Sequence, residues 1–163
     1  IKMVRFQYFQ VHRSLEWFVF QYVQVHRQSN WSVFQYFQDS KLPIDLNRKK
    51  VYISNIINYR PPENRRPTEE EIKRYLPFIT KHIEIINPKI LVLLGSTAMN
   101  ALIGNEVVIS KMRGKWIEKK FGNCKTSVII TFHPAFLMRQ PAQKKMAWID
   151  LKMIREKKSK LKI

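Results

Sequence analysis

An uninterrupted apolar segment, residues 89–94, most constrains what this chain can fold into. After its lysine, every side chain of the segment is apolar: Ile-Leu-Val-Leu-Leu. A strand of this kind is buried on both faces, which is typical of a parallel sheet covered by helices on either side. From residue 51 onward the predicted elements run strand, helix, strand, helix, strand, helix. This order predicts an α/β fold with three layers, α/β/α, around a central parallel sheet.

Polar residues stand at the ends of two other predicted strands, 51–57 and 125–132. Asn55 lies near the end of the first, where its amide suits the edge of a pyrimidine base, although asparagine is also a common turn former. His133 follows the second strand, which ends there because Pro134 cannot donate to a ladder. Ligands of open α/β sheets bind outside the carboxyl ends of the strands. His133 therefore either faces a substrate or is a hydrogen-bonded turn residue.

An apolar wedge and a fixed charge follow this histidine. Phe136, Leu137 and Met138 are expected to be exposed, and Arg139 comes directly after them. A wedge beside a cation suits a protein that enters a nucleic-acid stack while holding a phosphate. The alternative is an ordinary turn from strand to helix.

Basic residues are in large excess. The chain has 30 Lys+Arg against 12 Asp+Glu, a net charge of +18, which favours a polyanionic partner such as DNA, RNA or an anionic membrane surface. No apolar run is long enough to span a bilayer and no signal peptide is evident, so a cytoplasmic protein is expected. The one cysteine, Cys124, allows neither an intramolecular disulfide nor a cysteine-cluster metal site.

Further candidates for anion contacts lie in loops. Residues 58–67 combine three arginines with three prolines, which stiffen the loop. Residues 95–97, Gly-Ser-Thr, open a short helix where an anion can bind, although the same residues are ordinary caps. Residues 110–116 form a basic loop. Thr68 and Glu71 predict a capping box at the start of a long helix.

A 14-residue repeat occupies the N-terminal region. Residues 6–13 return as 20–27 and begin again at 34–38, with no glycine or proline between the copies. The repeat is either an aromatic, basic surface for single-stranded nucleic acid or a translated tandem DNA repeat never selected to fold. Near-identical copies favour the second interpretation, because neighbouring core layers demand different shapes.

The expected domain organisation follows from the repeat and from the last predicted helix. We expect residues 1–41 to lie outside the fold, residues 42–155 to form the domain, and residues 156–163 to form a basic tail. The last helix starts near residue 142, and Met146, Ile149 and Met153 or Ile154 are expected to face the core.

These motifs together resemble the iron–sulfur type of uracil-DNA glycosylase, often called family 4, from about residue 42 to residue 152. The matching blocks, in order, are residues 51–55, 60–65, 94–98, 113–116 and 133–139. The resemblance implies a base excision repair enzyme that flips uracil out of DNA and hydrolyses its N-glycosidic bond. Asn55 would read the uracil edge, and His133 would donate a hydrogen bond to an oxygen of the departing uracil anion.

The resemblance also implies contacts with DNA. Phe136, Leu137 and Met138 fall where the family wedges into the vacated stack. The candidates for gripping the strand are Arg60, Asn64, Arg65, Ser96, Arg113 and Arg139. The expected partner is uracil-containing DNA, single- or double-stranded, with no membrane partner, and the protein is expected to be a monomer.

The chain also departs from the family pattern. Nothing before Val51 resembles the family's glycine-rich segment, which helps to position the attacking water, or its uracil-stacking aromatic residue, so the first part of the fold is expected to be missing. Two of the four cluster cysteines fall at Tyr59 and Tyr75, and the upstream pair is absent. Because a phenol cannot replace a thiolate ligand, we expect no iron–sulfur cluster and no other metal. The alternatives are a glycosylase impaired by truncation, an inactive DNA-binding remnant, and a basic adaptor that works through the repeat.

Overall fold

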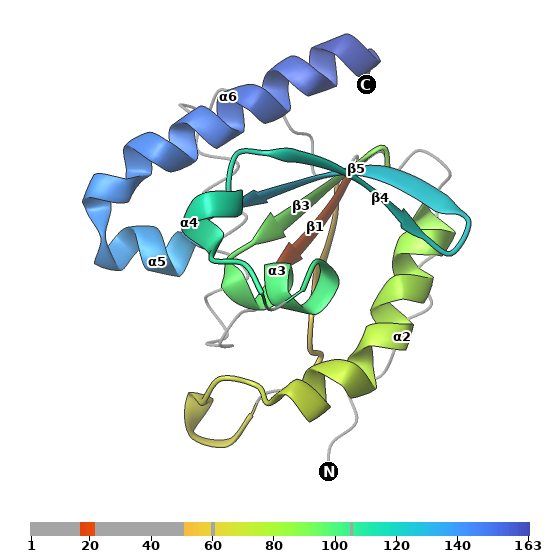
Figure 1. The fold of residues 1–163 in the computed structure, drawn as a ribbon, viewed down its shortest axis with the longest axis vertical. Coiled ribbons are helices and arrows are strands. Elements are labelled where there is room, and N and C mark those ends of the chain that lie inside the picture. Colours follow the sequence, from red (N-terminus) through yellow and green to blue (C-terminus); the bar gives the residue numbers. More distant parts are fainter. Residues whose placement is uncertain (1–16, 22–50, 60, 105) are drawn as a thin grey trace.

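The computed structural model describes residues 17–21, 51–59, 61–104 and 106–163 (Figure 1). The strands in these ranges are β1 Trp17–Gln21, β2 Val51–Asn55, β3 Ile90–Leu94, β4 Trp116–Phe121 and β5 Cys124–Thr131. The α-helices there are α2 Glu69–Ile86, α3 Ser96–Leu102, α4 Ile109–Met112, α5 Pro134–Arg139 and α6 Lys144–Leu161. Two 3₁₀ turns, η2 Pro62–Asn64 and η3 Pro141–Gln143, complete these elements.

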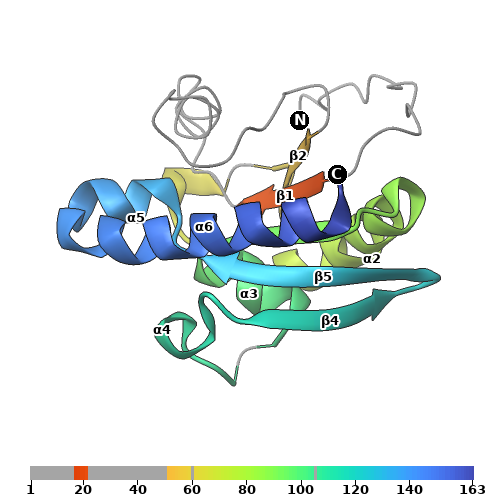
Figure 2. The same ribbon diagram turned by 90° about the horizontal axis from the view of Figure 1, so that it is seen from above.

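The described strands form one mixed sheet in the order β2-β1-β3-β5-β4. Figure 2 shows β2, β1, β5 and β4 of this sheet, with α6 lying across it. Four strands are parallel, but β4 runs antiparallel to β5. The α/β class is confirmed, and the expected parallel sheet is confirmed for β2, β1, β3 and β5, whereas the antiparallel strand β4 was not expected. Sequence reasoning passed over β4 because Glu118, Lys119 and Lys120 interrupt its apolar pattern. Charged residues are common on an edge strand because they discourage pairing with other chains.

Strand β1 comes from the repeat and lies inside the sheet. Val19 is in register with Ile53 of β2 on one side and with Val92 of β3 on the other. The expectation that residues 1–41 lie outside the fold is therefore wrong for Trp17–Gln21, and the sheet does not lack a strand at this position. The physical reason is that a central parallel strand requires a short apolar run, and Trp-Phe-Val-Phe supplies one. The rest of the repeat lies outside the described residues, and so does the hypothesis that the repeat forms a surface for single-stranded nucleic acid.

Helices cover both faces of the sheet (Figure 1), and β3 shows the consequence. Leu91 and Leu93 pack in a cluster with α2 and α3, whereas Ile90, Val92 and Leu94 pack in a second cluster with α6. All five side chains of β3 are buried, as the uninterrupted apolar segment predicted.

Helix α6 differs from its prediction in length and in phase. It continues to Leu161, so the boundary at residue 155 falls within a helix, and Ile163 packs against the core. Met146 and Ile149 are 45% and 51% exposed, so the expectation that they face the core is wrong. The buried face carries Ala147, Asp150 and Leu151 instead, and Ile154, which was also expected to face the core, is buried. A buried aspartate makes this face unrecognisable as an apolar stripe.

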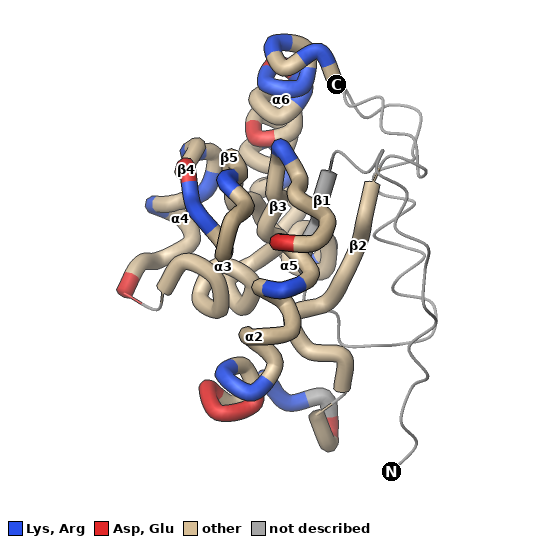
Figure 3. Tube along the Cα trace, turned by 90° about the vertical axis from the view of Figure 1, so that its right-hand side faces the viewer, with Lys and Arg blue, Asp and Glu red and all other residues tan. Residues whose placement is uncertain are grey.

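Basic residues lie along α6, which carries seven Lys or Arg residues against two acidic ones (Figure 3).

Helix α2 begins at the predicted capping box, in which Thr68 Oγ1 accepts from Glu71 N and the Glu71 carboxylate accepts from Thr68 N. Within the described ranges, no helix combines the length and the apolar character needed to cross a membrane.

We predict that Val19→Pro destabilises the fold by about 3 kcal/mol or more, because proline removes a ladder donor from a strand paired on both sides. Urea unfolding followed by tryptophan fluorescence measures the loss. Val33→Pro, at the same place one repeat later, is the matched control. Equal losses in the two variants would contradict a specific contribution of the paired strand Trp17–Gln21 to stability.

Candidate functional site

The carboxyl ends of four parallel strands meet at one edge of the sheet. The backbone register pairs Gln21 with both Asn55 and Leu94, and pairs Leu94 with Thr131. Asn55 and the His133 turn therefore belong to the same edge, as ligand sites of open α/β sheets require. Gln21 lies between Asn55 and Leu94 in the register of this edge. Sequence reasoning missed it because the repeat was expected to lie outside the fold.

His133 is held at this edge as a neutral hydrogen-bond donor. It is the N-cap of α5, and its Nδ1 accepts a hydrogen bond of 3.1 Å from the backbone N–H of Ala135. The ring proton of the neutral imidazole must therefore lie on Nε2. Burial, helped by the charge of Arg139, lowers the pKa of His133 to about 4, so the ring is neutral at physiological pH. Nε2 is buried and has no hydrogen-bond partner among the described residues.

Asn55 presents an unused acceptor at the same edge. It is the last residue of β2, and its Oδ1 is buried without a hydrogen-bond partner in the part of the chain that the structure describes. Buried polar atoms without partners are uncommon, and at a strand end they indicate a place for a ligand. Two others, in Asn100 of α3 and Thr126 of β5, do not stand at strand ends of this edge.

Gly95 brings the turn after β3 against His133. Its φ of +88° suits glycine, and its N–H donates to the carbonyl of Thr131 at 2.9 Å. A Cβ at this position would lie 3.1 Å from the Cβ of His133. The glycine thus allows the ends of β3 and β5 to close around the histidine. Ser96, which follows, is exposed at the start of α3.

The predicted wedge is only partly exposed. Leu137 is 1% exposed and packs with Phe132 and Ala147, so the expectation of three exposed residues is wrong for it. Phe136 is half-buried, with its ring centroid 4.9 Å from that of Phe132. Met138 is 69% exposed. The physical reason is that the segment is a helix, whose successive side chains point in different directions.

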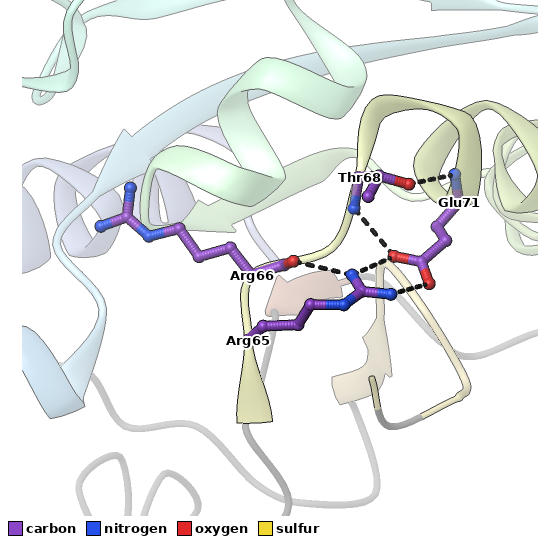
Figure 4. A network of polar contacts seen from close by, with 4 residues as sticks. All are labelled: Arg65, Arg66, Thr68 and Glu71. Carbon is purple, nitrogen blue, oxygen red and sulfur yellow. Dashed lines mark hydrogen bonds and ion pairs between the residues drawn. The ribbon is translucent and has the colours of Figure 1, made fainter. Parts of the chain in front are cut away.

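Arg65 is engaged within the protein. Its guanidinium makes two hydrogen bonds to the carboxylate of Glu71, at 2.8 and 2.9 Å, and a third to the carbonyl of Arg66 at 3.1 Å (Figure 4). The hydrogen bond from Arg65, followed by that from Thr68, lowers the pKa of Glu71 to about 2. Arg65 therefore orders the loop that leads into α2. The side chain of Arg66, another of the three arginines in the loop of residues 58–67, points away from Glu71 (Figure 4).

The other predicted phosphate contacts have different surroundings. The Arg113 side chain is only 13% exposed, because it pairs with Asp150 and its guanidinium lies 5.2 Å from the ring centroid of Phe132. Arg139, at the end of α5, is exposed. Arg60 and the side chain of Asn64 lie outside the described residues. Of the predicted set, Ser96 and Arg139 are thus the described side chains open to a phosphate.

The residues present do not fit a four-thiolate cluster. Tyr59 is 45% exposed and Tyr75 is half-buried, and neither offers a thiolate. The one cysteine in the sequence, Cys124, is buried at the start of β5, where burial raises the pKa of its thiol. Among the described residues, no group of three or more His, Cys, Asp or Glu side chains could hold a metal ion.

The lowered pKa of His133 predicts a pH-dependent stability. Between pH 6.5 and about 4, the unfolded histidine binds a proton that the folded one does not, so stability falls as the pH falls through this window. The slope from this one group is at most about 1.4 kcal/mol per pH unit. Urea unfolding of wild type and His133→Gln across this window isolates the effect, since His82, whose pKa burial also lowers, is common to both. Parallel stability curves would contradict it.

The contact between Gly95 and His133 predicts an asymmetry between two glycine substitutions. Gly104 also has a positive φ, +139°, but a Cβ there meets nothing within 4 Å. Both alanine variants carry backbone strain of about 1–3 kcal/mol, and only Gly95→Ala adds a contact with the histidine. We expect Gly95→Ala to be the more destabilised in urea unfolding. An equal or smaller loss than in Gly104→Ala would argue against close packing at this turn.

Comparison with known proteins identifies the family of the chain. A model of the uracil DNA glycosylase superfamily matches residues 12–152, a range that includes β1. The type-4 uracil-DNA glycosylase of Thermotoga maritima is 44% identical over 95 residues, which are 58% of this chain and 48% of that protein. Its counterparts from Sulfurisphaera tokodaii and Archaeoglobus fulgidus are 37% and 33% identical over 117 residues, 69% of this chain and 53% and 59% of theirs. The chain thus spans about half the length of the curated relatives that it matches. It belongs to the uracil DNA glycosylase superfamily.

Proposed function

We propose that this chain hydrolyses the N-glycosidic bond of deoxyuridine in DNA. The observation that carries the proposal is the buried, unused Nε2–H donor of His133, at the same sheet edge as the buried, unused acceptor of Asn55. The names of the relatives, type-4 uracil-DNA glycosylases, give the substrate class.

Asn55 would select the base. A uracil flipped out of the stack presents an N3–H donor beside carbonyl acceptors. The free Oδ1 of Asn55 would accept from N3–H while its amide nitrogen donates to a neighbouring carbonyl. Cytosine presents an acceptor at N3 and a donor at N4, the opposite pattern, so this orientation of the amide would reject it.

His133 would stabilise the leaving group. When the bond between C1′ and N1 breaks, its electron pair stays with uracil, and negative charge spreads onto the carbonyl oxygens. A neutral Nε2–H fixed in a buried position would donate to one of these oxygens, and such a donor acts most strongly where charge develops. Water adds its oxygen to C1′ and releases a proton to solvent, and the uracil anion takes up a proton from solvent. The products are free uracil and an abasic site.

The basic surface would hold the DNA strand. Arg139 and Met138 lie at the end of α5, next to the His133 turn, and α6 adds further lysines. Arg66 joins the candidates because its guanidinium turns away from Glu71 (Figure 4). We propose that the protein acts as a monomer and without an iron–sulfur cluster, since this stretch of chain supplies a single thiol.

A second function, DNA binding without excision, is favoured by a separate observation. The family's water-positioning segment has no recognisable counterpart before Val51, while the net charge of +18 suits any nucleic acid. In this case the domain would bind DNA through its phosphates alone.

Uracil release from a single-stranded oligonucleotide with one deoxyuridine tests the first function. We expect release by the wild type, and a rate lower by on the order of 100-fold in His133→Ala, because one oxyanion donor is lost. His82→Ala, a half-buried histidine on α2 that contacts Tyr52, is the matched control and should keep the activity.

The same preparation separates the alternatives. No release, with an affinity that falls steeply with salt, would establish the binding-only function, since phosphate contacts release counterions. An affinity that does not change with salt would rule out DNA as the partner.

A further inference from the structure

A buried carboxylate on α6 is the centre of a polar network that the proposed chemistry does not use. Asp150 is fully buried, with 0% exposure. Its Oδ1 accepts from Arg113 Nη2 at 2.6 Å, and its Oδ2 accepts from Arg113 Nε at 3.2 Å and from Thr131 Oγ1 at 2.6 Å. Arg113 also donates to the carbonyl of Met146. Every polar atom of the carboxylate is therefore satisfied, as a buried charge requires.

This network joins the three elements that surround the end of β5. Asp150 comes from α6, Thr131 ends β5, and Arg113 lies in the loop between α4 and β4. The loop packs closely against the carboxylate, because a Cβ at Gly114 would lie only 2.7 Å from Asp150 Oδ1. The N–H of Gly114 donates to the carbonyl of Ile130 at 3.0 Å, one residue before Thr131.

The network reaches His133 by two short paths. Thr131, which Asp150 holds by its hydroxyl, accepts the hydrogen bond from Gly95, the residue that packs against the histidine. Phe132, adjacent to His133, contacts both the guanidinium of Arg113 and the ring of Phe136 on α5. The backbone before His133 is thus tied down on both paths.

We propose that Asp150 is a positioning residue for uracil excision: through Thr131 and Arg113 it fixes the end of β5, and with it the direction of the His133 Nε2–H. This inference rests on the proposed function. A buried ion pair gives little net stability compared with apolar packing, so its use beside a reactive group is better explained by orientation. The proposal also assigns Arg113 to positioning rather than to contact with a DNA phosphate.

Thr131→Val is the decisive variant, because it removes the hydroxyl and leaves the ion pair of Arg113 and Asp150 in place. Thr126→Val on the same strand is the matched control, since the Thr126 hydroxyl is equally buried but has no partner among the described residues. Thr131→Ser, which keeps the hydroxyl, should restore the function. We expect Thr131→Val and Asp150→Asn to lower the single-turnover rate of uracil release about 10-fold or more, because small misplacements of catalytic groups are costly. Their affinity for uncleaved DNA should stay within about 2-fold, and Thr126→Val should match the wild type.

A second readout does not need catalysis. ¹⁵N NMR of labelled histidine reports which ring nitrogen of His133 carries the proton and whether the ring has one environment. We expect one Nε2–H form in wild type, Thr126→Val and Thr131→Ser, and a mixed or exchange-broadened signal in Thr131→Val and Asp150→Asn. If the wild type releases no uracil, the proposed function fails, and this measurement still decides the positioning role.

Two results would overturn the inference. One is a Thr131→Val protein that equals Thr126→Val in both rate and His133 signal, whether or not Asp150→Asn folds. The other is an Arg113→Gln protein, which lacks the positive charge, with an unchanged rate on saturating DNA but weaker binding and a salt slope reduced by about one, which is the signature of a lost phosphate contact.

Discussion

The parallel ladder that joins β2, β1, β3 and β5 is the constraint on which the site depends. Parallel strands deliver all their carboxyl ends to one edge, so the register alone puts Asn55, Gln21, Gly95 and the His133 turn side by side. A slip of one residue in any strand would turn its side chains to the opposite face of the sheet. The covered core on both faces resists such slips, because Leu91 and Ile90 already point into different clusters. Packing and chemistry therefore specify the same register.

The electrostatics of His133 follow from that packing. A chain of net charge +18 disfavours further positive charge, and Arg139 adds to the effect of burial at this ring. The hydrogen bond from Ala135 then selects which nitrogen carries the proton. The turn thus maintains a neutral donor inside a strongly basic protein. A cationic histidine would also attract phosphates without distinction, whereas a neutral one leaves phosphate binding to arginine and lysine and keeps its own proton for the base.

Local sequence was sufficient wherever the determining residues were neighbours. The apolar run of β3, the capping box of α2 and the turn at His133 were all recognisable for this reason. The phase of α6 was not, because its buried Asp150 is explained only by Arg113 and Thr131, 37 and 19 residues away. Strand β1 was missed because near-identical copies of one repeat cannot be ranked by their own sequence. Only the register with β2 and β3 shows that Trp17–Gln21 pairs in the sheet.

The central strand and the site place different demands on sequence. A central parallel strand needs a short run of apolar side chains, a condition that Trp-Phe-Val-Phe in β1 meets although its segment is repetitive. The site needs individual groups at individual positions, and these lie on strands and turns outside the repeat: Asn55, Gly95, Thr131 and His133. A sheet can therefore accept a strand of simple composition in its middle while its chemistry remains on neighbouring strands. The position at which these two demands meet is Gln21, a repeat residue placed by register at the functional edge.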